Sequence, residues 1–376
     1  MKKRILYLTT WDYANSATDG VCCKIDSEIK TFIDAGLHVD KIYLLNKDIH
    51  FLKDGLDRII GHTGKYKKIV AYMNMYKCIK NAKYDWIYNR YGMFDPFYIR
   101  VLKRLNKNGA RILIEVPTYP YKWERNKGLL NWILFFLDSI CLGSASKYID
   151  RVLTYSNDKT IWNVPTINII NGINVGLYRQ KGMNKAHDKQ INLVAIALMQ
   201  PSHGYERIIK GISEYYKLSK GRYEVFLHLI GDGPELSFYK NIVIDNSLEK
   251  YVFFHGRMDQ EQIADFIDGM DLGVCALAGY KKNVFLTSEL KSREYIVRGI
   301  PFVYACDMDI EDKLDGDMAI KFENNDSVID INRIVEFYEE IKDSYQRISN
   351  KMHALACDRL DMSHTMKPVI DYIEWK

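Results

Sequence analysis

Residues 288–303 read SELKSREYIVRGIPFV, and this stretch carries the strongest signal for both fold and function. Ser288 is of a type that caps helices, and the first turn of a helix presents backbone N–H groups that suit an anion such as a pyrophosphate. Lys291 adds a positive charge there, and Glu294 is placed to accept hydrogen bonds from a ribose diol. The stretch therefore predicts a helix that binds a nucleoside diphosphate. A solvated helix with charges at ordinary spacing is the alternative.

Two turns upstream have a similar character. The first reads IGDGPE over residues 230–235 and follows an apolar strand, so Gly231 and Gly233 allow the backbone to approach a ligand closely. The second contains Gly256 and Arg257 and follows another strand, and an arginine at such a strand end can hold a phosphate or stack on a base. An ordinary tight turn and a solvated arginine are the alternatives at these two positions.

The whole chain has 376 residues, which is too long for one ordinary core and predicts two domains. Short apolar runs alternate with amphipathic stretches of helical length, a pattern typical of parallel sheets covered by helices on both faces. We predict a doubly wound lobe over residues 1–182, a linker near 183–190, a second such lobe over residues 191–358 and a C-terminal helix over residues 359–376. The strands expected are residues 5–8, 39–45, 86–88, 111–114, 151–155 and 166–170 in the first lobe, and 191–198, 225–230, 251–254, 272–277 and 301–304 in the second.

The order of IGDGPE, FHGRM and SELKSREYIVRGIPFV resembles the nucleotide-binding half of retaining glycosyltransferases of the GT-B fold, in the large family 4 group. The likeness extends to the turn NGIN at residues 171–174 and to Gly20 after the first strand. It covers nearly the whole chain and is strongest over residues 191–303. The resemblance implies an α/β chain with two doubly wound, Rossmann-like lobes facing a central cleft, and a C-terminal helix that crosses back onto the first lobe.

The same resemblance implies a set of residues that contact the donor. Ser288, Leu290 and Lys291 would hold the diphosphate, and Glu294 the ribose. Gly20 would let the first lobe approach the donor phosphate. The other matching positions are His203 and Gly204 after the first strand of the second lobe, and Gly231, Gly233 and Arg257 around the base.

Two positions depart from the family pattern. His203 replaces the usual phosphate-binding lysine, and a histidine is charged only part of the time near neutral pH. The family often has a further glutamate eight positions before the one that binds the ribose, and here that position is Leu286. Because that glutamate usually touches the donor sugar, the identity of the sugar stays open, whereas the nucleotide site is retained.

Glu115 follows the strand at residues 111–114 and is expected to face the cleft. There it would position an acceptor hydroxyl or stabilise positive charge at the anomeric carbon; a structural hydrogen-bond acceptor is the alternative. Arg90 ends the preceding strand and would pair with Glu115 or reach the acceptor. The predicted catalytic residues are Glu115, His203 and Lys291.

Asp307 and Asp309 have the spacing of a metal-binding DxD, but they lie in an acidic loop beyond the nucleotide strand. The resembling family neutralises the diphosphate with side chains and helix N-termini. We therefore predict no metal and no cofactor, with the nucleotide sugar as a substrate. The resemblance also implies transfer with retention, in which the departing diphosphate takes the proton of the acceptor.

The composition narrows the choice of partner and compartment. The net charge of +5 is modest and the basic residues are spread along the chain, which argues against nucleic acid as a partner. The seven cysteines show neither metal-ligand nor redox spacing, and Trp11 and Asp12 interrupt an N-terminal apolar run that is too short for a secretory signal. We expect a cytoplasmic protein, either free or at the inner face of the membrane.

Residues 129–142 read LLNWILFFLDSICL and are apolar almost all round, yet they are too few to span a membrane. Three interpretations stay open: a buried helix, a helix lying in a membrane surface as a peripheral contact, and an oligomer contact. The basic residues between 122 and 127 keep the membrane interpretation open.

The hypothesis that results is a retaining glycosyltransferase. It would move a hexose-type sugar from a UDP- or GDP-linked donor to a glycan, lipid-linked or protein acceptor in the synthesis of cell-surface polysaccharide or glycoconjugates. A non-catalytic subunit of the same fold that stabilises a partner transferase is the main alternative, favoured by His203 and Leu286 and opposed by Lys291 and Glu294. A Rossmann oxidoreductase is disfavoured because residues 9–19 contain no glycine, where a GxGxxG turn would follow the first strand.

Overall fold

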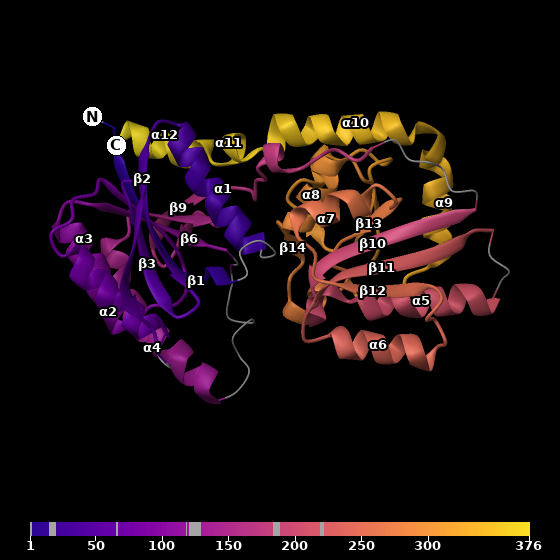
Figure 1. Cartoon of the computed structure of the whole chain (residues 1–376), viewed down its shortest axis with the longest axis horizontal. Coiled ribbons are helices and arrows are strands. Elements are labelled where there is room, and N and C mark those ends of the chain that lie inside the picture. The colour runs from indigo at the N-terminus through magenta and orange to yellow at the C-terminus, as the bar shows by residue number, and fades with distance from the viewer. Residues whose placement is uncertain are drawn as a thin grey trace. The chain divides into compact units, whose positions relative to one another are not determined.

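The computed structural model describes residues 2–14, 20–64, 67–117, 119, 129–182, 189–218 and 222–376. By internal contact the chain forms two compact units, residues 1–170 with 365–376, and residues 171–364. Each unit is a largely parallel sheet covered by helices, so the predicted α/β class is confirmed (Figure 1).

Among the described residues, the sheet of the first unit has nine strands. In spatial order they are β4 (Leu56–His62), β3 (Asp48–Lys53), β2 (His38–Leu45), β1 (Arg4–Asp12), β5 (Trp86–Arg90), β6 (Arg111–Val116), β7 (Arg151–Thr154), β9 (Val164–Asn168) and β8 (Thr160–Ile161). The six central strands, β2, β1, β5, β6, β7 and β9, run parallel. At one edge β3 and β4 are added by antiparallel pairing, and at the other edge β8 is added in the same way. The helices are α1 (Gly20–Asp34), α2 (Lys67–Ile79), α3 (Pro96–Lys107), α4 (Leu129–Ala145) and α12 (Lys367–Trp375).

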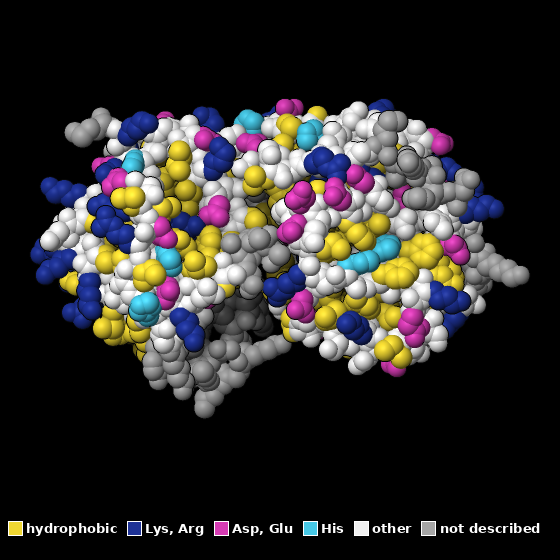
Figure 2. Space-filling model, viewed as in Figure 1, with side chains coloured by type: hydrophobic (Ala, Val, Ile, Leu, Met, Phe, Trp, Pro, Cys, Tyr) yellow, Lys and Arg dark blue, Asp and Glu magenta, His cyan; other side chains and the backbone are white. Residues whose placement is uncertain are grey.

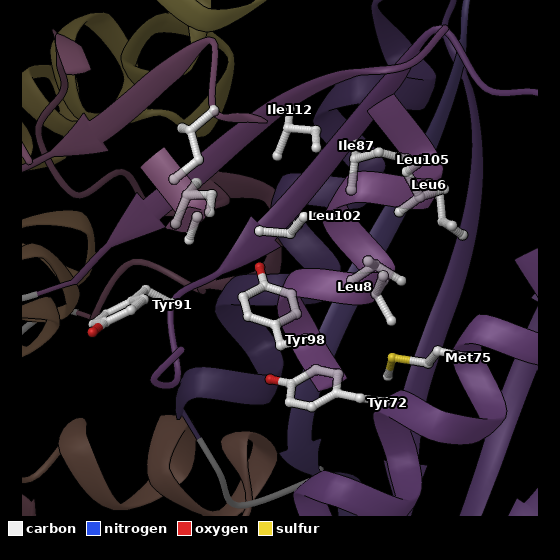
Figure 3. Packing of buried hydrophobic residues seen from close by; sticks show 14 of the residues in the cluster. Leu6, Leu8, Tyr72, Met75, Ile87, Tyr91, Tyr98, Leu102, Leu105 and Ile112 are labelled. Atoms are coloured by element: carbon white, nitrogen blue, oxygen red, sulfur yellow. The ribbon is translucent and has the colours of Figure 1, made fainter. Parts of the chain in front are cut away.

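The core of the first unit lies between the sheet and helices α2 and α3. Strands β1, β5 and β6 are short apolar runs, and their buried side chains face buried side chains of the two helices (Figure 3). The residues that meet there include Leu6, Leu8, Ile87, Ile112, Tyr72, Met75, Tyr98, Leu102 and Leu105. Asp95 caps α3 by accepting hydrogen bonds from the N–H groups of Phe97 and Tyr98, which fixes where this helix begins.

The C-terminal helix α12 packs on the first unit, as predicted. The ring of Tyr372 lies edge to face with Trp86 of β5 at 5.6 Å between centroids, and the guanidinium of Arg151 lies 4.9 Å from the same Tyr372 ring. Lys3 Nζ donates to the carbonyl oxygen of Ile373 at 2.6 Å, so the two ends of the chain lie side by side (Figure 1).

Helix α4 has one buried side in its described part. The carboxylate of Asp138 is 1% exposed and accepts hydrogen bonds from the Tyr91 hydroxyl at 2.6 Å and from the Phe94 N–H at 2.6 Å. Phe136 and Ile140, in contrast, are 53% and 59% exposed. The interpretation as a buried helix is therefore wrong for the side of α4 that carries Phe136 and Ile140. The membrane and oligomer interpretations stay predictions, and the basic residues between 122 and 127 lie outside the described residues.

The second unit has the strand order of a doubly wound dinucleotide-binding fold, with a reversal between β10 and β13. Its parallel strands, in spatial order, are β12 (Val252–Gly256), β11 (Glu224–Asp232), β10 (Gln190–Leu198), β13 (Leu272–Val274), β15 (Phe302–Tyr304) and β17 (Ala319–Lys321), and β14 (Leu286–Thr287) pairs separately with β16 (Asp307–Met308). The helices are α5 (Tyr205–Leu218), α6 (Leu236–Asp245), α7 (Gln260–Ile267), α8 (Leu290–Arg298), α9 (Ile331–Ile341), α10 (Tyr345–Leu355) and α11 (Met362–Thr365). In such a sheet, ligands bind at the carboxyl ends of the strands beside the reversal.

Residues 171–182, which the sequence analysis places in the first lobe, group with the second unit by contact. The N–H of Ile173 donates to the Leu360 carbonyl at 2.8 Å, and the N–H of Lys181 donates to the Arg298 carbonyl at 2.8 Å. This segment therefore lines the second unit beside helix α8.

Candidate functional site

Helix α8 begins at Leu290, and Ser288 and Glu289 separate it from the short strand β14. Its N-cap residue is Glu289, in extended conformation, and among the described residues no side chain caps the helix. Ser288 is therefore not the cap that the sequence suggested, since it lies one residue earlier. The first N–H groups of a helix have no partner within the helix, so an uncapped start leaves them available to an anion. Leu290 and Lys291 form this first turn and are partly exposed.

The hydroxyl of Ser288 is used by the protein itself. It donates to Asp309 Oδ2 at 2.6 Å and accepts from the Asn171 N–H at 3.0 Å and from Arg293 Nη2 at 3.2 Å. A hydroxyl has one proton and two lone pairs, so these bonds use its full capacity. Its predicted contact with a diphosphate would need one of these bonds to break, and stays a prediction.

Arg293 is the residue of this region that the sequence analysis missed. It has no exposed surface, forms an ion pair with Asp309, and donates to the carbonyl oxygens of Asn171 at 3.2 Å and Glu289 at 3.3 Å. It thereby fastens the 171–182 segment and the N-cap of α8 to the loop after β16. The DxD spacing has a structural explanation, because Asp309 pairs with Arg293 and Asp307 pairs with Lys321 at 2.6 Å.

Lys291 brings a positive charge to the start of α8. Its Nζ lies 3.8 Å from Glu289 Oε2, and both side chains are mostly buried. The Glu289 carboxylate also accepts a long hydrogen bond of 3.4 Å from the Ala276 N–H, just after β13. Lys291 is therefore held at the carboxyl end of β13, beside the point where the strand order reverses.

His203 closes the 3-10 helix η5 (Pro201–His203) that follows β10. Its Nδ1 accepts a hydrogen bond from the Gln200 N–H at 3.0 Å, so the neutral ring carries its proton on Nε2. Burial, with the nearby charges of Lys291 and Lys282, holds the pKa of His203 well below its usual value. From the sequence, His203 was expected to be protonated part of the time near neutral pH. This expectation is corrected, because near pH 7 His203 is a neutral N–H donor.

Gly204 is required by close packing. It has a φ of +63°, and a Cβ there would lie 2.4 Å from the Cβ of Ala278. The Leu277 N–H donates to the His203 carbonyl at 2.8 Å across the same contact. The glycine thus lets the turn after β10 meet the segment after β13, and this contact places His203.

Gly231 and Gly233 serve the packing of the end of β11 against the end of β10. Their φ angles are +122° and +148°, and a Cβ would lie 1.9 Å from the Ala197 carbonyl oxygen in the first case and 2.6 Å from the Met199 nitrogen in the second. The Met199 N–H donates to the Asp232 carbonyl at 2.7 Å. The alternative of a tight turn describes this geometry, and a contact with the base stays a prediction.

Arg257 follows β12 and is exposed, with its Nε 3.8 Å from Asp232 Oδ2. Rings flank this turn: His228 and His255 lie 3.0 Å apart between ring nitrogens, and both pack against Phe266. Figure 2 shows histidine and hydrophobic side chains gathered over the β11 and β12 region of the second unit. The turn therefore presents a charged side chain beside a ring-rich surface.

Glu294 lies one turn into α8 and is partly exposed. Its Oε1 accepts from the Tyr178 hydroxyl at 3.5 Å. Burial raises the pKa of Glu294, while the charges of Arg298 and Lys291 oppose that rise. Because a carboxylate has four lone-pair positions, most of its acceptor capacity is left for a ligand.

In the first unit, Glu115 has no exposed surface and is surrounded by donors. It accepts from Lys24 Nζ at 2.8 Å, Arg90 Nη1 at 3.0 Å, the Tyr155 hydroxyl at 2.7 Å and the Tyr88 hydroxyl at 3.2 Å. Burial alone would raise the pKa of Glu115, but the charges of Arg90 and Lys24 lower it to about 2. The predicted Arg90–Glu115 pair is confirmed. The exposure expected of Glu115 is not observed, and its geometry is that of a structural acceptor.

Gly20 is the first residue of α1 and is exposed, with no atom within 4 Å of the position of a Cβ. Packing within the described residues therefore does not demand glycine here, and an approach of its backbone to the donor stays a prediction. The preceding residues 15–19 lie outside the described residues.

One group of described residues has the spacing to hold a metal ion: His38, Asp40 and Asp54 in the first unit. Arg4 Nη2 lies 2.9 Å from Asp40 Oδ2 and 3.0 Å from Asp54 Oδ1. The positive charge that these carboxylates attract is therefore supplied by an arginine.

Known proteins resemble this chain in structure rather than in sequence. No protein-family model matches it, and it has no match among curated protein sequences. Sucrose-phosphate synthase from Thermosynechococcus elongatus superposes with a TM-score of 0.69 at 13% identity, over 100% of this chain and 98% of that one. A glycosyltransferase from Rickettsia africae gives 0.67 at 11% identity over 100% and 98%, and Anabaena HepE in complex with UDP gives 0.64 at 12% identity over 100% of both chains.

These likenesses show the fold. The chain has the GT-B fold, with two Rossmann-like lobes and a C-terminal helix on the first, as the sequence resemblance implied. Within the described residues, no helix is both long and apolar enough to cross a membrane.

Proposed function

We propose that the chain is a retaining glycosyltransferase whose second unit holds the diphosphate of a nucleotide-sugar donor at the start of α8. The observation that carries the proposal is the convergence at this point of an uncapped helix start, the Lys291 ammonium and the Glu294 carboxylate. A diphosphate needs N–H donors and positive charge, and a ribose diol needs a carboxylate that still has acceptor capacity.

The chemistry follows from stabilising the leaving group. The acceptor oxygen forms a bond to the anomeric carbon while the bond from that carbon to the diphosphate oxygen breaks, and the acceptor proton passes to that departing oxygen. Lys291, the first N–H groups of α8 and a neutral N–H from His203 Nε2 are the protein's donors to the charge that develops there. Glu115 would act indirectly, by holding Lys24 and Arg90 in place.

The donor is proposed to be UDP- or GDP-linked, with a hexose-type sugar. UDP is the first to test, because HepE was solved in complexes with UDP and with UDP-glucose. The acceptor is proposed to be a glycan, a lipid-linked intermediate or a protein in surface-polysaccharide synthesis. We propose no metal, since basic side chains and a helix N-terminus supply the positive potential.

The experiment is a donor screen that follows release of UDP or GDP from a small panel of nucleotide sugars. Lys291→Met and Glu294→Gln remove the proposed contacts, and Lys250→Met is the matched control because Lys250 is an exposed lysine of the same unit. We expect one donor to be turned over by the wild type and the control, and by neither variant of the site. Loss of one contact to a charged ligand corresponds to about 2–3 kcal/mol, or roughly a hundredfold in affinity.

The alternative is a non-catalytic subunit that stabilises a partner transferase. The neutral state of His203 favours it, because an uncharged donor attracts a diphosphate less than a lysine would. Absence of turnover for every donor, together with no heat of binding for UDP or GDP, would exclude the catalytic proposal in favour of this alternative.

A further inference from the structure

Arg298, the last residue of α8, is buried without full satisfaction of its donors. It is 1% exposed, and its Nη2 donates to Gln260 Oε1 at 3.0 Å. Its Nε and Nη1 are buried and have no hydrogen-bond partner among the described residues. Leaving N–H groups of a charged side chain unpaired in a protein interior costs free energy, so packing alone does not explain an arginine here.

Three neighbours of Arg298 lie in or beside the candidate nucleotide site. Gln260 opens α7, three residues after Arg257. The ring of Tyr178 lies 5.1 Å from the Arg298 guanidinium, and its hydroxyl bonds to Glu294. Glu294 itself precedes Arg298 by four residues, so the two side chains lie on the same face of α8. Arg298 therefore connects the turn after β12 with the carboxylate expected to bind the ribose.

We propose that Arg298 is a positioning residue that, together with Tyr178, keeps Glu294 ionised and oriented for a ribose diol. What Glu294 binds rests on the proposed function. An ionised carboxylate can accept from both hydroxyls of a diol, whereas a protonated one turns one of its oxygens into a donor. Arg298 thus makes the site selective for a ribonucleotide over a deoxyribonucleotide.

The electrostatic surroundings agree with this role. Burial raises the pKa of Glu294, and Arg298 is the first of the groups that oppose the rise, followed by Lys291 from the same helix and by the Tyr178 hydroxyl. Arg298 in turn is faced by Arg179 and Asp268 as well as by Glu294 and Tyr178. Removing the Arg298 charge leaves the effect of burial less opposed, so Glu294 should then bind its proton at higher pH.

The first test does not depend on any ligand. Glutamate labelled with carbon-13 at its carboxyl group reports the pKa of Glu294 by NMR, with the signal assigned through Glu294→Gln. We expect Arg298→Met to raise this pKa and Arg298→Lys to restore much of the wild-type value. The control is Arg179→Met, which removes a half-exposed arginine already paired with Asp268 at 2.9 Å and should leave Glu294 unchanged. An unaltered pKa in a folded Arg298→Met variant overturns the proposal.

The second test measures UDP and 2′-deoxy-UDP affinity by calorimetry between about pH 5.5 and pH 8. We expect Arg298→Met to lose UDP affinity mainly at the acid end, by about tenfold for each unit that the Glu294 pKa rises, and to lose part of the preference for the ribose form. A uniform loss at every pH and for both ligands would show a merely structural role. If the wild type binds neither UDP nor GDP, the proposed function fails, whereas the NMR measurement still decides what Arg298 does to Glu294.

Discussion

Arg293 of α8 and Asp309 after β16 form an ion pair in which the guanidinium has no exposed surface. The Ser288 hydroxyl joins both partners, at 2.6 Å from Asp309 Oδ2 and 3.2 Å from Arg293 Nη2. Arg293 also holds the carbonyl of Glu289, the N-cap of α8. The pair therefore fixes the position of the helix start at which we expect the diphosphate.

Asp309→Asn should destabilise the chain strongly. Removing one partner of a buried ion pair leaves the other charge without compensation, which costs about 3–5 kcal/mol. Urea unfolding at neutral pH measures this loss. The matched control is Asp307→Asn, because the Asp307–Lys321 pair is largely exposed and should contribute less than about 1 kcal/mol. Equal effects of the two substitutions would show that Asp309 is not an anchor.

Gly231→Ala should prevent the end of β11 from packing on β10. The added Cβ would lie 1.9 Å from the Ala197 carbonyl oxygen, and the φ of +122° is strained for any other residue. We expect a loss above about 4 kcal/mol, visible as a collapse of soluble yield or of the thermal midpoint. Gly256→Ala is the comparison: its φ is +70° but its Cβ would meet nothing within 4 Å, so the cost should stay near 1 kcal/mol. Similar midpoints for the two variants would contradict this account.

The sequence was sufficient for most of the parallel strands, because each is a short apolar run between helical stretches. It missed β17, which has only three residues, and the two-residue strands β14 and β16. It did not reveal the β3–β4 hairpin, although Asp54 and Gly55 form its two-residue turn with positive φ at both positions. Most side chains of β4 are exposed, so the strand lacks the alternation of a half-buried strand. The Asp-Gly pair was the available signal.

At the site, the motif was enough to place Lys291 and Glu294 on one helix, since their spacing is local. The surroundings of Glu115 could not be predicted from the sequence. Lys24 lies 91 residues away along the chain, and only the packing of α1 brings its ammonium to the Glu115 carboxylate. The protonation state of His203 likewise depends on burial and on Lys291 and Lys282, which no local pattern encodes.

Glu115→Gln should change the acid stability of the chain. The pKa of Glu115 is lowered to about 2, below its usual value, so its ionised form contributes stability above about pH 4.5 that is lost as the pH falls toward 2. That contribution is on the order of 3 kcal/mol. Wild type should therefore exceed Glu115→Gln at pH 7, and the two should converge in acid. Asp34→Asn, an exposed carboxylate of the same unit, is the control that should leave the curve unchanged; a constant gap between wild type and Glu115→Gln down to about pH 3 would refute the assignment.

Lys181 gives the opposite dependence at alkaline pH. Its side chain is 4% exposed and donates to the Met270 carbonyl, and burial lowers its pKa from 10.5 to about 8 despite the charges of Asp271 and Asp268. Between pH 8 and 10.5 the unfolded chain keeps this proton while the folded chain has lost it, so stability rises with pH in that window. Relative to Lys181→Met, which cannot titrate, wild type should gain about 3 kcal/mol across it. Urea unfolding of both proteins at intervals from about pH 7 to pH 10 measures the difference, with Lys250→Met as an exposed-lysine control. Parallel stability curves for wild type and Lys181→Met would mean that the amine keeps its ordinary pKa and that solvent reaches the buried end of the 171–182 segment.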